Sequence, residues 1–142
     1  MVTYWVYNEL VREIKREGAV IMATSEIFNN KIEILRSLIE TQATKEMVEG
    51  LLKANTVLSV DTVNSITSKT CPCYAKPGRK YTKIDIGGSG RYMVDNETGD
   101  IFGIKAYGVV HLGYHFGNLD TIFDWYWGGY RAHKISKTLF NT

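Results

Sequence analysis

The residue types of this 142-residue chain change abruptly near Thr70, and the change limits the folds open to it. Before that position Ile, Leu, Val and Glu dominate, whereas 71–142 holds 13 of the 17 aromatic residues and 11 of the 13 glycines. The segment at this boundary contains Pro72 and Pro77, which cannot continue a helix, and Gly78, which favours a turn. We therefore expect a helical section, 1–70, and a β-rich section, 71–142, in one compact domain or two closely packed subdomains.

The first section shows the apolar spacing of amphipathic helices. Apolar residues recur at three- and four-residue intervals, and Ser or Thr residues that can cap a first turn precede them. This pattern predicts three helices and a short fourth one, separated by short connections. In order, they run from Thr3 to Gly18, from Thr24 or Ser25 through Ile39, from Thr44 to a left-handed stop at Asn55, and from Ser59 with Val60, Val63 and Ile66 inward.

The second section shows the two-residue alternation of strands. In 81–86 the side chains of Tyr81, Lys83 and Asp85 share the face opposite Thr82, Ile84 and Ile86. Asx and Gly residues in 95–100 are typical of a hairpin with a type I turn and a bulge. Three or four antiparallel strands are expected, in the segments 81–86, 91–94, 101–107 and 109–116.

The last apolar segment reads as a helix that Asp120 caps. It carries Ile122, Phe123, Tyr126, Trp127 and Tyr130, although Gly128 and Gly129 disfavour a helix by about 1 kcal/mol each relative to alanine. The expected fold class is therefore α+β: three to four N-terminal helices, a three- to four-stranded antiparallel β-meander and an aromatic C-terminal helix.

Basic residues alternate with tyrosines in the first two predicted strands. Residues 71–91 contain five basic residues and one acidic residue, although the net charge of the whole chain is only +2. Cations on a sheet can follow a phosphate backbone while exposed rings stack on bases; alternatively, the rings complete the core and the lysines solvate the sheet. The leading hypothesis is a non-enzymatic protein that binds single-stranded DNA or RNA through Arg79, Lys80, Tyr81, Lys83, Arg91, Tyr92, Lys105 and Tyr107.

Consecutive aromatic residues in 123–130 support an alternative function. They would cover every side of a helix, so a single buried face cannot take them all. Trp, Tyr and Arg dominate the energetics of protein interfaces. The alternative is therefore a self-assembling homo-oligomer, of the virion or filament subunit type, with contacts through Trp125, Tyr130 and Arg131.

Two cysteines and two histidines raise the possibility of a zinc-stabilised interaction module. Two thiolates and two imidazoles can complete a tetrahedral zinc site. The C-x-C spacing departs from the usual C-x2-4-C pattern, and the glycine between the histidines argues against a shared helical face. The ligands would be Cys71, Cys73, His111 and His115; no other cofactor is expected.

Several classes of protein are disfavoured by what the sequence lacks. It contains no G-x-S-x-G, H-E-x-x-H, P-loop or Rossmann pattern, which favours a non-enzymatic function. No apolar run reaches the roughly 18–20 residues of a membrane span, so no membrane partner is expected. Charges among the first thirty residues and the lack of a disulfide framework predict a reducing intracellular location or a virion.

Overall fold

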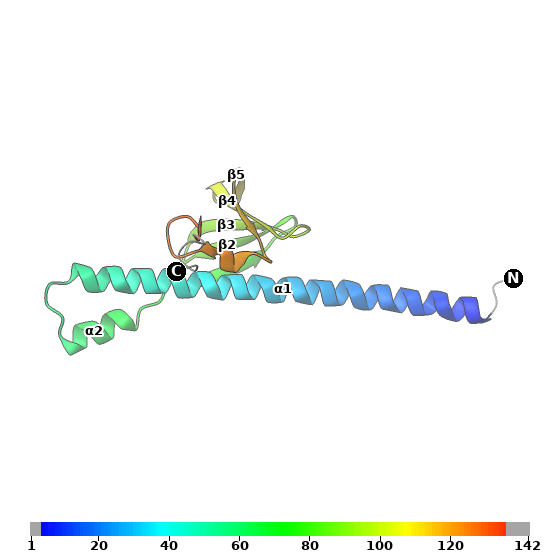
Figure 1. Cartoon of the computed structure of the whole chain (residues 1–142), viewed down its shortest axis with the longest axis horizontal. Helices are drawn as coiled ribbons and strands as arrows, with labels where there is room; N and C mark the ends of the chain where they lie inside the picture. The colour runs from blue at the N-terminus through cyan, green and yellow to red at the C-terminus, as the bar shows by residue number, and fades with distance from the viewer. Residues whose placement is uncertain (1–3, 136–142) are drawn as a thin grey trace, which may run out of the picture. The chain divides into compact units, whose positions relative to one another are not determined.

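The structure, a computed structural model, describes the backbone of residues 4–135 and the side chains of residues 25–135. The chain divides into two compact units, Met1–Lys31 and Ile32–Thr142, with the boundary inside the first helix. The elements, shown in Figure 1, are α1 (Tyr4–Ala54), α2 (Val60–Thr67), β1 (Cys73–Pro77), β2 (Tyr81–Ile86), β3 (Ser89–Asp95), β4 (Asp100–Ala106), β5 (Val109–Asn118), a 3-10 turn η1 (Ile122–Asp124), β6 (Trp125–Tyr126) and β7 (His133–Lys134).

The expectation of three to four N-terminal helices is wrong, because the first three predicted helices are one. Helix α1 runs for 51 residues through both expected connections. Neither connection contains proline, and Gly18 disfavours a helix by only about 1 kcal/mol relative to alanine. Across the second connection, Leu35, Ile39 and Ala43 continue one buried stripe at helical spacing, so packing favours an unbroken helix there.

The end of α1 and the start of α2 agree better with the sequence. Helix α1 ends at Ala54, and the Asn55 side-chain amide donates to the carbonyl oxygen of Leu51 at 2.6 Å. A left-handed stop at Asn55 is wrong, since no non-glycine residue in the described part of the chain has a positive φ. The predicted cap of α2 is confirmed, because the Ser59 hydroxyl accepts from the amide of Thr62 at 3.1 Å.

The sheet has five antiparallel strands in sequence order, one more than the upper expectation. The predicted strand 81–86 is confirmed, and so is the following hairpin, in which Gly99 takes a φ of +76°. The Asp95 carboxylate accepts from the amides of Glu97 and Thr98 inside that turn. The unexpected strand, β1, is an edge strand that ends at Pro77, and an edge is where a sheet tolerates proline.

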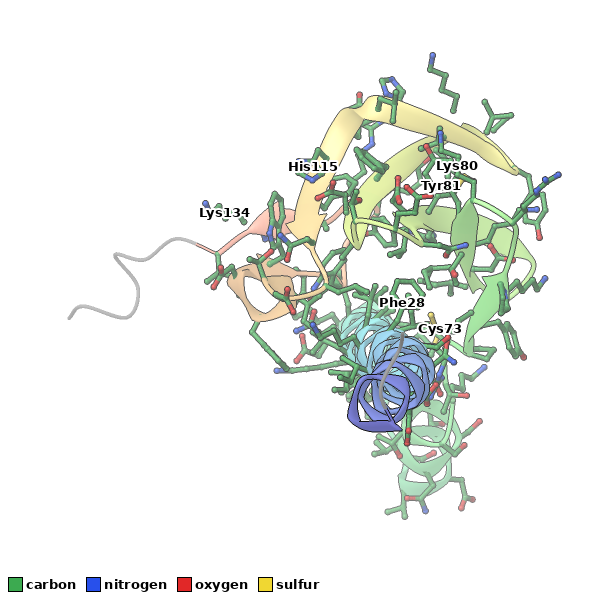
Figure 2. All side chains as sticks on the ribbon, turned by 90° about the vertical axis from the view of Figure 1, so that its right-hand side faces the viewer. Phe28, Cys73, Lys80, Tyr81, His115 and Lys134 are labelled. Atoms are coloured by element: carbon green, nitrogen blue, oxygen red, sulfur yellow. The ribbon has the colours of Figure 1, made fainter. Side chains whose placement is uncertain are left out.

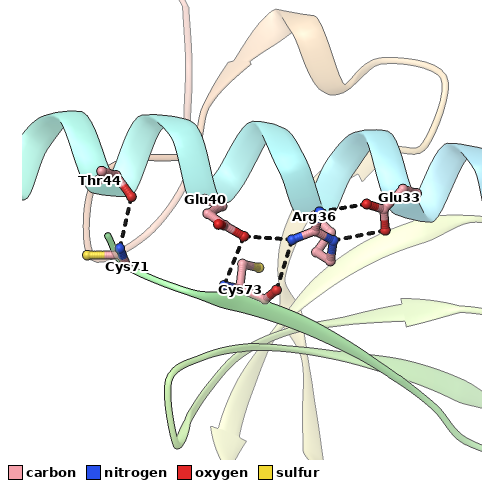
Figure 3. A network of polar contacts seen from close by, with 6 residues as sticks. All are labelled: Glu33, Arg36, Glu40, Thr44, Cys71 and Cys73. Atoms are coloured by element: carbon pink, nitrogen blue, oxygen red, sulfur yellow. Dashed lines mark hydrogen bonds and ion pairs between the residues drawn. The ribbon is translucent and has the colours of Figure 1, made fainter. Parts of the chain in front are cut away.

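A polar network joins the α1 residues of the second unit to the start of β1 (Figure 3). The Arg36 guanidinium bonds to the carboxylates of Glu33 and Glu40 at 2.6 Å each and donates to the carbonyl oxygen of Cys73 at 3.1 Å. The amide of Cys71 donates to the Thr44 hydroxyl at 2.9 Å. These contacts fix the edge of the sheet against the helix, above the core formed by Ile32, Leu35, Ile39, Ile84, Val94 and Ile101.

The predicted C-terminal helix is wrong. Residues 122–124 form a single 3-10 turn, and two short strands, β6 and β7, pair with each other instead. Trp127, which is completely buried, donates from its indole to the carbonyl oxygen of Ile122 and from its backbone to the Gln42 side chain. The two glycines that follow disfavour a helix, and burial of this one indole decides how the segment folds.

Candidate nucleic-acid interface

Six of the eight predicted binding residues divide between two surfaces of the curved sheet seen in Figure 2. Pairing of β1 with β2 places Tyr74 beside Asp85 and Lys76 beside Lys83, so these four residues share a face. We call the surface formed by Tyr74, Lys76, Lys80, Tyr81, Lys83 and Tyr107 the outer surface. The second, which we call the pocket surface, consists of Arg91, Lys105, Tyr114, Tyr130 and Arg131, all of which line one hollow.

One buried acid organises the outer surface. Asp85 is 1% exposed, and its Oδ2 receives the Lys76 ammonium at 3.1 Å and the Tyr107 hydroxyl at 3.1 Å. The bond that Lys76 makes to Asp85 raises the pKa of Lys76 most, and the contact of Lys76 with the Tyr107 hydroxyl raises it further. The Lys83 ammonium lies 5.0 Å from the centre of the Tyr107 ring, so the ring contacts a cation while its hydroxyl contacts the acid.

The pocket surface surrounds a hollow of about 290 Å³ on β3, β4 and β5, close to the lower end of the range for small-molecule sites. The Arg131 guanidinium lies 4.0 Å from the centre of the Tyr114 ring, and that of Arg91 lies 5.4 Å from the Tyr130 ring. Arg91 also donates to the carbonyl oxygen of Tyr130 at 3.1 Å, which holds the guanidinium beside the ring. The Tyr130 side chain is 81% exposed.

Among the described residues, no acid lines the hollow beside these cations. The residues that line the hollow include Arg91, Lys105 and Arg131 but no Asp or Glu. Within residues 25–135, none of the three forms an ion pair.

Buried aromatic rings that pack against one another form the base of the hollow. Tyr92 is 2% exposed and meets Phe116 and Trp127 edge to face, with ring centres 5.5 and 5.2 Å apart. Burial raises the pKa of Tyr92 to about 12. The Tyr92 ring, expected to stack on a base, is enclosed by these neighbours and supports the hollow instead.

The remaining candidates fall at different places. Arg79 lies in the exposed turn between β1 and β2, next to Lys80 of the outer surface, and Trp125 is half-buried against Phe116 with ring centres 5.7 Å apart. Tyr130 and Arg131, predicted for self-association, belong to the pocket surface. Self-association through these residues stays a prediction.

The four expected zinc ligands lie in two separate places. Cys71 contacts Met47 and Thr44, and Cys73 is buried beside α1, whereas His115 bonds to Asp100 on the other side of the sheet (Figure 2). His111 bonds to the amide of Gly113. Among the described residues no group of three or more His, Cys, Asp or Glu side chains is placed to hold a metal ion. Zinc binding by these four residues stays a prediction.

Tyr114 is the pocket residue that the sequence analysis missed. It lies on β5, two positions before Phe116, and both side chains line the hollow. Strict alternation along 109–116 would have placed the two rings on one face. Gly113, which lies between His111 and Tyr114 and disfavours a regular strand, weakens that signal.

Comparisons with known proteins leave the function to be inferred from the chain itself. No family model, curated protein or solved structure matches it. In the part of the chain that the structure describes, no helix is both long and apolar enough to cross a membrane.

Proposed function

We propose that this protein binds single-stranded nucleic acid at the pocket surface. The observation that carries the proposal is the convergence of Arg91, Lys105 and Arg131 with the exposed Tyr130 ring around a hollow that no acid of residues 25–135 lines. A single strand offers the two matching features together, phosphates and unpaired bases. In a duplex the bases are stacked on one another, so their faces are not free for a tyrosine.

The arginines suit phosphate particularly well. A guanidinium presents its N–H donors as a rigid fork that matches two phosphate oxygens. Arg91 is already held by its bond to the carbonyl oxygen of Tyr130. A side chain fixed in this way loses little conformational freedom when a ligand binds, which favours affinity.

The proposed interface differs from the interface that the sequence predicts. Arg91 and Lys105 remain in it, and Tyr114, Tyr130 and Arg131 join it. Tyr92 acts as a support, and Arg79, Lys80, Tyr81, Lys83 and Tyr107 lie outside the hollow.

Fluorescence anisotropy with labelled oligothymidylate, measured from low to moderate salt, tests the proposal. Each phosphate contact to a single strand contributes about 0.7 to the slope of log affinity against log salt. Replacing Arg91, Lys105 and Arg131 together by alanine should therefore reduce that slope by about 2. The matched control, alanine at Arg79, Lys80 and Lys83, removes the same charge and should change it far less.

Two results would contradict the proposal. Affinity that does not change with salt would exclude phosphate contacts, because such contacts release counterions. Equal losses in the two triple variants would show that net charge, and not the pocket surface, determines binding. Circular dichroism of both variants verifies that they are folded.

A further inference from the structure

We infer that the site takes two consecutive nucleotides, with one base on each side of the Arg91–Tyr130 pair and the linking phosphate on Arg91. The inference rests on the proposed function and deepens it. Its basis is a second hollow, of about 360 Å³, which shares Arg91 and Tyr130 with the first. The two hollows therefore meet at this pair.

The second hollow has a different chemistry from the first. Its walls include Ala43, Met47, Cys71 and Ile86, and Arg91 is the one cation among the described residues that line it. The Cys71 thiol lies 3.5 Å from the Met47 sulfur, so two soft, polarisable groups form one wall. Such a surface suits the flat, uncharged face of a base.

An acid disfavours phosphate in the second hollow. Glu46 lines it, and its Oε2 accepts from the Tyr126 hydroxyl at 2.7 Å. That bond raises the pKa of Tyr126 to about 12. With a carboxylate on one side and Arg91 at the boundary, a phosphate is favoured at the boundary and a base inside.

The Arg91–Tyr130 pair lies where the two hollows meet and therefore separates the two bases of the inferred complex. Arg91 is anchored to the Tyr130 carbonyl oxygen, which keeps its guanidinium beside the ring. Gly128 and Gly129 complete the wall of the second hollow, and a Cβ at Gly128 would lie only 2.9 Å from the carbonyl oxygen of Gln42. A side chain at Gly128 would therefore push this segment away from α1 and change the hollow.

The two cysteines provide a direct test. Cys71 is half-buried and lines the second hollow, whereas Cys73 is buried, and burial raises the pKa of its thiol to about 12. In iodoacetamide alkylation followed by mass spectrometry, Cys73 therefore serves as the unreactive internal reference. The probes are 5′-phosphorylated thymidine and the 5′-phosphorylated dithymidine.

The dinucleotide should bind at least about tenfold more tightly than the mononucleotide, since it adds a second base and the linking phosphate that contacts Arg91. It should also slow the alkylation of Cys71 at least about threefold at saturation, whereas the mononucleotide should leave the rate unchanged. Equal affinities for the two probes, with no protection of Cys71, would overturn the two-nucleotide site. The proposed function would survive that result if the pocket triple variant still lost affinity for oligothymidylate.

A pair of variants tests the second hollow without the thiol. Met47→Glu places a second acid in that hollow. The affinity for the dinucleotide should fall to that for the mononucleotide, and the affinity for the mononucleotide should not change. Val48→Glu adds the same charge one residue further along α1, outside the lining of both hollows, and should affect neither probe. Equal effects of the two variants on dinucleotide binding would contradict the inference.

Discussion

The outer surface and the pocket surface contain the same types of residue but differ in what their cations contact. Each holds a cation against a tyrosine ring, Lys83 at Tyr107 in one and Arg131 at Tyr114 in the other. On the outer surface, however, Lys76 also pairs with Asp85, whereas none of the acids that the structure describes lines the hollow of the pocket surface. One buried carboxylate therefore distinguishes a surface on which one of three lysines has an acidic partner from one on which, among the described residues, no cation has one.

The local backbone explains how Asp85 becomes buried. The β2–β3 register shifts between Ile84 and Asp85, which indicates a bulge at this point. Opposite it stands Gly90, where a Cβ would lie 2.9 Å from the Ile104 side chain and 3.1 Å from the Tyr107 ring. The missing side chain at Gly90 thus lets the Tyr107 ring approach β3 closely and reach the carboxylate.

The largest expected effect comes from removing the support of the pocket surface. Trp127→Ala should lower the free energy of unfolding by about 3–5 kcal/mol, because it leaves a cavity beneath Tyr92 and Phe116. Chemical denaturation measures the change. Phe123→Ala is the control, since that side chain is 71% exposed and its loss should change stability by less than about 0.5 kcal/mol. Equal losses would show that Trp127 is not a core residue.

An acid placed in the hollow should remove the difference between the two surfaces. Lys105→Glu should weaken oligothymidylate binding about tenfold to a hundredfold, because it replaces a phosphate contact with repulsion. Lys80→Glu makes the same charge change in the β1–β2 turn and should weaken binding by less than about threefold, since salt screens a distant exposed charge. Anisotropy titrations at one salt concentration compare them, and the reverse order of effects would contradict the assignment.

Removing the acid of the outer surface should have a smaller effect. Asp85→Asn should lower the free energy of unfolding by about 1–2 kcal/mol, because a buried group loses its charge-assisted bonds. It should also raise oligothymidylate affinity about twofold, since Lys76 is then free to contact phosphate. Asp124→Asn makes the same charge change at an exposed position and should leave stability unaltered. Weaker binding by Asp85→Asn would show that freeing Lys76 is not enough.

The smallest predicted change concerns the protonation of Lys76 alone. Its pKa should lie above the ordinary 10.5 and return toward that value in Asp85→Asn, as followed by NMR of the lysine side chain. Because the folded pKa is raised, the contribution of this pair to stability is complete below pH 10.5 and disappears as the pH rises through the raised pKa. An identical titration in the two proteins would show that Asp85 does not control Lys76.

Local interactions alone determined several parts of the fold, and these were predictable. The cap at Ser59, the strand from Tyr81 to Ile86 and the turn that begins at Asp95 each depend on residues within a few positions of one another. Short stretches of sequence are sufficient to predict such caps and turns. The basic and aromatic residue types of the proposed interface were also visible in the sequence.

Tertiary structure decided the rest, because the deciding contacts join residues far apart in the chain. Trp127 bonds to Gln42 and Tyr126 to Glu46, and these contacts hold the segment that a helix was expected to occupy. The same packing brings Tyr130 and Arg131 to Arg91, Lys105 and Tyr114, which no local pattern relates. The sequence by itself determined which residues could bind a polyanion, and long-range burial decided which of them share a surface and which cation an acid neutralises.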